Sequence, residues 1–332
     1  MEPKLLTSDE VAQRVEITVD ADPPHLMPVS TPARSLPRFF EPSIDAANSY
    51  ANYLTSEGSF QTGFKGIDIC MPGGLDRGDM FLIIGKTHSG KSTIAYNSVI
   101  HNLQRSSDFR AVIFSPDEPR ELAIAKLYSI AFQRNSAETE KAIREGDVAH
   151  VQEFENACRG LLDRVLICDQ SLTFSQMLSA MDEAQSYWNA PANAVVMDYL
   201  ELLPGDSADA NSVAHKAQEA KRFAKVADVP LVLLHQIGRG ASKRGTAGGI
   251  SAGRFGGESE AVAVLECYRQ KDREDLSHQD QIRFVDSINL SLCKNKRPPF
   301  RLIDIEMVLD PNSGRIREPS VHDMQDRDWE EF

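Results

Sequence analysis

The residues with the clearest chemistry form a glycine-rich loop that ends in Lys91 and Ser92. The run GKTHSGKS matches the pattern G-x-x-x-x-G-K-[ST] in full, and it stands between an apolar run, MFLIIG, and a helical pattern, STIAYNSVI. Successive backbone N–H groups of such a loop, with a helix N-terminus behind it, can surround a phosphate chain. Lys91 would then reach the β- and γ-phosphates, and Ser92 would bind Mg²⁺. We therefore predict a nucleotide site that takes ATP and Mg²⁺ and consists of Gly85, Lys86, Thr87, His88, Ser89, Gly90, Lys91, Ser92 and Thr93.

Carboxylates follow two other apolar runs. Asp198 ends the run AVVM, where an acid that positions Mg²⁺ is expected on a strand near the phosphate loop. Asp117 and Glu118 follow AVIFS, the first strand-like run after the loop, and one of them could orient or deprotonate a water molecule. Because acids also favour helix N-termini, the pair could instead cap a helix that begins near Pro119.

Gln236 follows the apolar run PLVLLH, where its amide could contact both the γ-phosphate and the loop that comes next. That loop, residues 237–257, is rich in glycine and carries cations but no acid, although the net charge of the chain is −13. Such a loop is suited to bind the phosphates of a single DNA strand, and the alternative is a plain solvated loop. Its one aromatic residue, Phe255, favours phosphate contact over base stacking. The predicted DNA contacts are Arg239, Lys243, Arg244 and Arg254.

A second group of cations, Lys294, Lys296 and Arg297, follows the strand-like run NLSLC and is cut off by two prolines. The prolines end the strand, so that the cations project from it. They could be a solvated charge cluster or a finger that enters the nucleotide site of an adjacent subunit. Since a planar guanidinium can bridge two phosphate oxygens, we expect Arg297 to stabilise the transition state, with Lys296 assisting.

The elements that must position these side chains are typical of an α/β domain. Near-continuous apolar runs at 80–85, 111–115, 164–168, 194–198 and 230–235 alternate with helical patterns. This alternation predicts a mostly parallel, twisted sheet that is flanked by helices on both faces. A helix over 211–227 is predicted to bury Val213, Ala217, Ala220, Phe223 and Ala227, and to turn outward Lys216, Glu219, Arg222 and Lys225.

Local composition suggests four regions. Residues 1–42 hold seven of the 17 prolines and are predicted to form a flexible arm. Residues 43–61 are predicted to form a linker helix, which packs on its own domain or on a neighbouring subunit. The nucleotide-binding domain then covers 62–312. The acidic tail, 313–332, either keeps the protein in solution or docks on a polymerase, a primase or a single-strand-binding protein through Trp329 and Phe332.

The overall composition excludes several classes of protein. Of the 332 residues, 41% are hydrophobic and 26% charged, and the apolar runs are all shorter than the roughly 18 residues of a membrane span. The acidic start does not read as a signal peptide, and the five scattered cysteines form no CxxC pair. We therefore expect a cytoplasmic protein with reduced thiols, no membrane contact and no zinc ribbon. The net charge argues against a basic coat for nucleic acid but permits a local basic channel.

In their order, these motifs resemble the ATPase domain of DnaB-type replicative helicases, which are RecA-like P-loop NTPases. The resemblance runs from residue 62 to about 305 and rests on the blocks TGFKGIDICMPGGLDRGDMFLIIGKTHSGKST, FSPDEPRE, VVMDYLELL, HQIGRG and GGESEAVAVLECYR. It implies a RecA-like fold, a ring that is a hexamer in the family, and 5′→3′ movement along single-stranded DNA. The short form resembles a phage-encoded or accessory helicase of bacterial or phage-infected cells.

Two positions depart from the family pattern. The resemblance places Asp117 where the family has its catalytic glutamate, and Lys296 where the K-x-R finger has its arginine, so that Arg297 is the nearest guanidinium. Similar blocks occur in RadA- and KaiC-like ATPases, and the alternative enzyme is therefore a recombination or branch-migration ATPase. The other alternative is an ATP-switched clamp or adaptor without robust unwinding.

Overall fold

The computed structural model describes residues 43–55, 60–198, 200, 210–237, 257–272, 276–320 and 323. The chain divides into two units, Met1–Asn52 and Tyr53–Phe332. Helix α2 (Ser43–Thr55) contains the described residues of the first unit and crosses into the second, and its residues Ile44 and Tyr50 are exposed. A helix is thus present in the predicted linker region, whereas the predicted arm lies outside the described residues.

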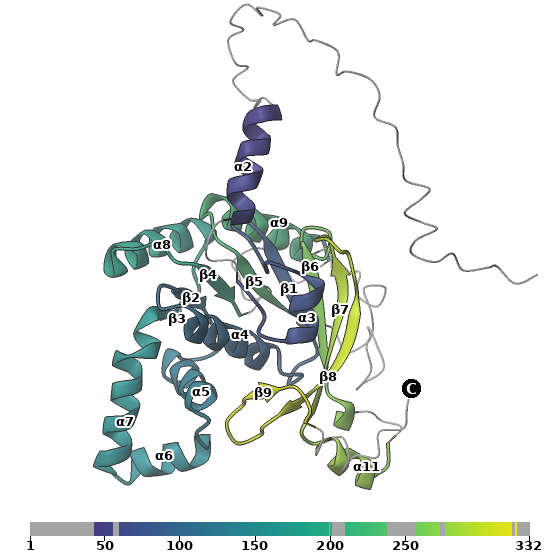
Figure 1. Cartoon of the computed structure of the whole chain (residues 1–332). Coiled ribbons are helices and arrows are strands. Elements are labelled where there is room, and N and C mark those ends of the chain that lie inside the picture. Colours follow the sequence, from purple (N-terminus) through teal and green to yellow (C-terminus); the bar gives the residue numbers. More distant parts are fainter. Residues whose placement is uncertain are drawn as a thin grey trace, which may run out of the picture. The chain divides into compact units, whose positions relative to one another are not determined.

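A nine-stranded sheet forms the centre of the second unit, with the strand order β3-β2-β4-β5-β1-β6-β7-β8-β9 (Figure 1). Six neighbouring strands pair in parallel: β1 (Met80–Gly85), β2 (Ala111–Phe114), β3 (Val165–Cys168), β4 (Ala194–Met197), β5 (Leu231–Gln236) and β6 (Ala263–Tyr268). The remaining three continue the sheet in antiparallel fashion: β7 (Ser287–Asn295), β8 (Ile303–Leu309) and β9 (Ile316–Arg317). The predicted mostly parallel sheet is confirmed.

Helices cover both faces of the parallel strands (Figure 1). One apolar core joins alternate strand residues to α3 (Lys65–Cys70), α4 (Lys91–Arg105), α5 (Arg120–Phe132) and α7 (Val148–Arg159). A second core joins the other strand residues to α8 (Phe174–Trp188) and α9 (Ala210–Val226). Because successive residues of a strand point to opposite faces, these two cores require strands that are apolar throughout.

Short elements complete the described part of the unit: α6 (Ser136–Arg144), η1 (Leu161–Arg164), η3 (Gln270–Asp272) and α11 (His278–Arg283). Among the described helices, none combines the length and the apolar character that a bilayer crossing requires.

The predicted helix 211–227 corresponds to α9, but one side chain differs from the expectation. Ala217, Ala220 and Phe223 are buried as predicted. Lys216, which was expected to face away, is also buried, at 9% exposure. A lysine can be covered along its long aliphatic stem, so that its charge is a poor guide to its position on a helix.

The folded unit also extends beyond residue 312, where the sequence suggests that the tail begins. Asn97 of α4 donates a hydrogen bond to the carbonyl of Gly314 (2.9 Å) and accepts one from the N–H of Ile316 (3.0 Å). These contacts hold β9 against the sheet. Residues up to Arg317 therefore belong to the sheet, although their sequence is polar.

The sheet has two edges that matter for function. The carboxyl edge is defined here as the edge where the parallel strands end, and it receives the segments that follow β1, β2, β4 and β5. Strand β7 runs in the opposite direction, and Asn295 at its end lies opposite Ala263, the first residue of β6. The segment after β7 therefore lies at the other edge, the amino edge.

Candidate nucleotide-binding site

The phosphate loop connects β1 to α4 at the carboxyl edge, and its two glycines are required by the local geometry. A Cβ on Gly85 would lie 2.7 Å from the carbonyl oxygen of Cys267 and closer still to the hydroxyl of Ser89. Gly90 has φ +99°, and a Cβ there would lie 2.8 Å from the side chain of Ile288. At both positions the backbone lies so close to neighbouring atoms that the Cβ of any other residue would clash with them.

Lys91, the first residue of α4, folds its side chain back over this loop. Its ammonium donates hydrogen bonds to the carbonyls of Gly85 (3.0 Å) and Lys86 (2.9 Å). The cation therefore lies beside the loop backbone and the N-terminus of α4, where the phosphates of a nucleotide would also be attracted. Thr87 and His88 are exposed at the tip of the loop, and His88 adopts φ +61° in the turn.

Ser92 and Asp198 form the oxygen pair that fits Mg²⁺. Asp198 directly follows β4, is buried, and accepts a hydrogen bond from the side chain of Ser92. Burial is the main reason why the pKa of Asp198 is raised, and the hydrogen bond from Ser92 and the nearby Lys91 cation act in the opposite direction. Keeping this carboxylate ionised therefore costs free energy unless a cation is bound to it. A hydroxyl and a carboxylate beside a phosphate loop are the ligand types that Mg²⁺ uses in nucleotide sites.

The two candidates for the catalytic base have different surroundings. Glu118 forms an ion pair with Lys126 of α5, and the hydroxyl of Tyr96 lies 3.5 Å from its Oε2. Burial, and then the charges of Asp198 and Glu118, raise the pKa of Tyr96, so that its hydroxyl stays protonated and can donate. Asp117 is exposed at the same edge.

The alternative role of these acids as helix caps is not supported. The N-cap residue of α5 is Pro119, whose side chain makes no capping hydrogen bond, and the backbone N–H of Arg120 donates to the carboxylate of Asp169 at 3.3 Å. Arg120 at the start of α5 is instead bound by Asp169, which follows β3 and lies 2.7 Å from its guanidinium. Asp117 and Glu118 are therefore not engaged in capping α5, and both lie close enough to Asp198 for their charges to raise its pKa.

Gln236 links β5 to the phosphate loop. Its side-chain amide donates a hydrogen bond to the hydroxyl of Thr87. The next residue, Ile237, donates its N–H to the carbonyl of Gly85 at 3.1 Å. The strand that precedes the predicted DNA-binding loop is thus joined to the nucleotide site at two points. The cations of that loop, Arg239, Lys243, Arg244 and Arg254, lie outside the described residues and stay predictions.

The cations after β7 are not brought to this site. The N–H of Lys296 donates to Val262 (2.8 Å), and the N–H of Val262 donates to Met80 (2.9 Å), so that Lys296 lies level with the first residue of β1. The phosphate loop begins at the last residue of β1, Gly85, which at about 3.3 Å per residue is roughly 16 Å farther along the sheet. A lysine or arginine side chain cannot cover this distance within one subunit.

Some residues of the site carried no signal in the sequence. Tyr96 and Lys126 surround Glu118, but they are separated from it by 22 and eight positions and belong to no motif. A tyrosine within an apolar helix face could have been suspected of needing a partner for its hydroxyl. The partners of Arg297, Asp76 and Asp79, are more than 200 positions away from it.

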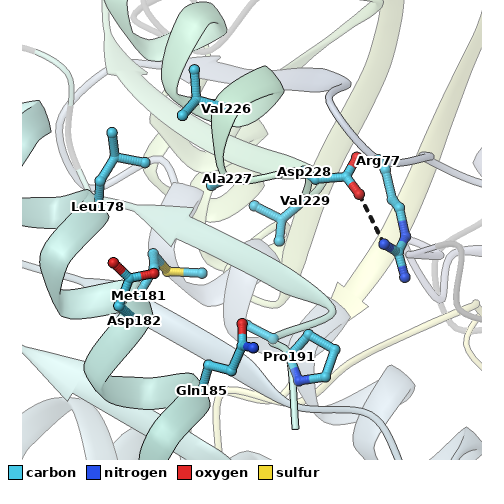
Figure 2. Close-up of a pocket in the computed structure, with 11 residues that line it drawn as sticks. Arg77, Leu178, Met181, Asp182, Gln185, Pro191, Val226, Ala227, Asp228 and Val229 are labelled. Atoms are coloured by element: carbon cyan, nitrogen blue, oxygen red, sulfur yellow. Dashed lines mark hydrogen bonds and ion pairs between the residues drawn. The ribbon is translucent and has the colours of Figure 1, made fainter.

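A separate pocket of about 470 Å³ lies at the amino edge, away from the phosphate loop (Figure 2). It is lined by Leu178 and Met181 of α8 and by Val229 before β5, and the ion pair between Arg77 and Asp228 (2.8 Å) lies beside it. None of the predicted site residues that the structure describes lines this pocket. This pocket is therefore separate from the candidate nucleotide site at the carboxyl edge.

Residues 59–308 match the family model of the DnaB-like helicase C-terminal domain. Over 265 residues the chain is 24% identical to the replicative DNA helicase DnaB of Synechocystis sp. (strain ATCC 27184 / PCC 6803 / Kazusa), a match that covers 74% of this chain and 30% of that protein. The chain therefore spans less than a third of the length of this curated relative.

Solved structures with the same fold include an ATPase domain and a helicase. The ATPase domain superposes with a TM-score of 0.66 at 17% identity, covering 84% of this chain and 98% of that one. A DnaB-like replicative helicase, whose structure was described with its interactions with primase, gives a TM-score of 0.65 at 18% identity, covering 85% and 67% of the two chains. The predicted RecA-like fold is confirmed. Because the family model spans most of the folded unit, the chain belongs to the family of DnaB-like helicase C-terminal domains.

Proposed function

We propose that this protein is an ATP-dependent DNA helicase that moves along single-stranded DNA as a ring-shaped oligomer, with the hexamer as the preferred assembly. One observation carries the proposal. The phosphate loop, the metal-site residues and the candidate bases lie together at the carboxyl edge, whereas the cations of the finger lie at the amino edge of the same subunit. A nucleotide site of this kind is completed by a neighbour, and family membership supports the same arrangement.

Each residue of the site has a role that follows from its position. The backbone amides of residues 85–91 and the ammonium of Lys91 bind the phosphates, and Ser92 and Asp198 hold Mg²⁺. When bound, Mg²⁺ neutralises the charge that develops on the phosphate oxygens. Asp117 orients and deprotonates the attacking water, because its carboxylate is exposed near Asp198 while that of Glu118 is held by Lys126. Catalysis then depends on positioning and charge stabilisation rather than on a covalent intermediate.

Movement along DNA requires a path from the nucleotide to the DNA-binding loop. The contacts of Gln236 with Thr87 and of Ile237 with Gly85 supply this path, since both residues stand at the start of the 237–257 loop. A change at the tip of the phosphate loop shifts the end of β5 and, with it, the loop that carries the predicted cations. The DNA contacts made by these cations are with phosphates, which makes them independent of sequence.

Further partners follow from the acidic tail. The predicted tail, 313–332, ends in a sequence of acids with Trp329 and Phe332 among them, a composition that suits docking on a polymerase, a primase or a single-strand-binding protein. The solved relative with a described primase interaction makes primase the first partner to examine. The replicative relative from Synechocystis supports a function in the cytoplasm of a bacterial or phage-infected cell.

The proposal is tested by the ATPase rate with and without single-stranded DNA, measured together with the mass of the protein in solution. We expect a ring-sized particle whose ATPase rate rises when single-stranded DNA is added. A forked duplex without any homologous strand should be unwound, which distinguishes a helicase from a recombination ATPase. A monomer with a DNA-independent rate, or turnover without unwinding, would contradict the proposal.

A further inference from the structure

The finger segment, residues 294–297 at the end of β7, holds its arginine in a socket formed by its own chain. The guanidinium of Arg297 contacts the carboxylates of Asp76 (2.9 Å) and Asp79, and the exposed fraction of the three side chains is only 18%, 14% and 12%. The two acids are fixed relative to each other, because Asp79 also accepts the N–H of Asp76 at 3.0 Å. Removing the guanidinium would leave two largely buried carboxylates side by side without their cation, which is strongly unfavourable.

The turn that follows this arginine is closed by a neighbouring amide. The side chain of Asn295 donates to the carbonyls of Cys70 (2.8 Å) and Arg301 (3.2 Å) and accepts the N–H of Arg297 (2.8 Å). Both sides of the turn are therefore tied to one side chain and, through Cys70, to the end of α3. The turn keeps a fixed direction while its solvent-facing side chains stay movable.

The two lysines of the segment are held differently from the arginine. The ammonium of Lys294 donates to the carbonyls of Glu258 and Ser259, and its side chain is partly buried. Lys296 is exposed, and its ammonium donates to the neutral carbonyl of Ser259 at 3.0 Å, a surface contact that water or a phosphate can replace. Its backbone is nevertheless fixed by the hydrogen bond to Val262. The backbone of Lys296 is thus fixed, while its ammonium group can exchange one hydrogen-bond acceptor for another.

We propose that Lys296 is the cation that enters the nucleotide site of the adjacent subunit, and that Arg297 is a positioning residue which aims it from the socket of Asp76 and Asp79. This inference rests on the proposed function, and it reverses the expectation from the sequence that Arg297 is the finger. A guanidinium is better than an ammonium at bridging two phosphate oxygens, but here it is engaged by carboxylates of its own subunit.

The test is a double-mutant cycle on DNA-stimulated ATP turnover, with kcat and KM measured separately and ring formation checked by native mass. Lys296→Ala should lower kcat by roughly 10³-fold or more, the range of a removed finger, and leave the KM for ATP nearly unchanged. Lys296→Arg should keep or raise kcat. Arg297→Ala and Asp79→Asn should also lower kcat. In a chain that already carries Lys296→Ala, however, adding Arg297→Ala should hardly lower kcat further, because Arg297 acts through Lys296.

Two controls separate the roles. Arg301→Ala removes an exposed cation from the same turn and should leave kcat unchanged, so a loss equal to that of Lys296→Ala would overturn the assignment. Arg297→Ala should lower the unfolding temperature because it breaks the socket, whereas Lys296→Ala should not. The inference is also overturned if Lys296→Ala keeps full activity or if Arg297→Ala adds a further large loss to it. A wild-type protein without DNA-stimulated turnover would instead refute the proposed function, whatever the variants do.

Discussion

Asp117→Asn and Glu118→Gln should have very different effects on ATP turnover, although the two acids are neighbours. Asp117 is exposed near Asp198, and a base that activates water contributes roughly 10²–10⁴-fold to a rate. This range corresponds to about 2.7–5.4 kcal/mol of transition-state stabilisation. Asp117→Asn should therefore reduce kcat by that factor and leave the affinity for ATP nearly intact, because the carboxylate acts on water and not on the nucleotide.

The expected loss for Glu118→Gln follows from its contacts. Its partner Lys126 has a side chain that is 53% exposed, and an ion pair of this kind contributes about 0.2–1 kcal/mol. The hydroxyl of Tyr96, at 3.5 Å, is too far away for a strong hydrogen bond. If only these contacts are lost, kcat should fall by less than about sixfold. Lys126→Ala, which removes the same ion pair from the other side, is the matched control and should give a similar small change.

The assay is single-turnover hydrolysis at saturating ATP and single-stranded DNA, with nucleotide affinity measured separately by fluorescence titration. The reasoning is refuted if Glu118→Gln stops turnover while Asp117→Asn retains it. The catalytic position would then be one residue later than the resemblance to the family implies, and Lys126 would be a partner of the base.

Lys91→Ala should abolish nucleotide binding, because this ammonium reaches the β- and γ-phosphates, and calorimetry that shows wild-type affinity would contradict the loop assignment. Gly85→Ala should also weaken binding, since the new Cβ would lie 2.7 Å from the carbonyl oxygen of Cys267, and unchanged affinity would count against the tight loop geometry. Asp198→Asn should raise the unfolding temperature of the metal-free protein at pH 7. Burial raises the pKa of the Asp198 carboxyl, so that ionising it destabilises the folded state at a pH above this raised pKa. The difference between the variant and the wild type should disappear as the pH falls below the ordinary pKa of an aspartate. A variant with a lower unfolding temperature than the wild type at pH 7 would contradict this. Neutralising the loop cations together should flatten the salt dependence of single-stranded DNA binding by up to roughly 0.7 slope units per lost contact, and an unchanged slope would exclude phosphate contacts by Arg239, Lys243, Arg244 and Arg254.

The strands of the fold could be predicted from the sequence because they are buried on both faces. The run MFLIIG coincides with β1, the predicted runs for β2, β3 and β4 are each one residue longer at one end, and the run for β5 is shifted by one residue at both ends. Each strand contributes to both apolar cores, which leaves a continuous apolar pattern. The candidate site residues with fixed spacing, such as Lys91 and Ser92, could be predicted for a related reason, since the backbone curve around a phosphate prescribes the positions of the glycines.

Contacts between segments that are distant in the sequence could not be predicted in the same way. By its chemistry alone, the guanidinium of Arg297 is better suited than the ammonium of Lys296 to bind a phosphate. Its ion pair with Asp79, however, joins residues 218 positions apart and leaves no local pattern in the sequence. The burial of Lys216 likewise depends on what α9 packs against and not on the helix pattern. Such pairings leave no local pattern, so a single sequence gives the type of a side chain but not its partner.

The central claim is that each nucleotide site is completed by a cation from the adjacent subunit. The most direct measurement mixes Lys91→Ala chains with Lys296→Ala chains and follows DNA-stimulated ATP turnover of the mixture. Each variant alone should be inactive. In mixed rings, some interfaces join an intact phosphate loop to an intact finger, and we predict that turnover returns in proportion to their number. If turnover stays absent although native mass spectrometry shows mixed rings, the sites are not completed in trans and the account is wrong.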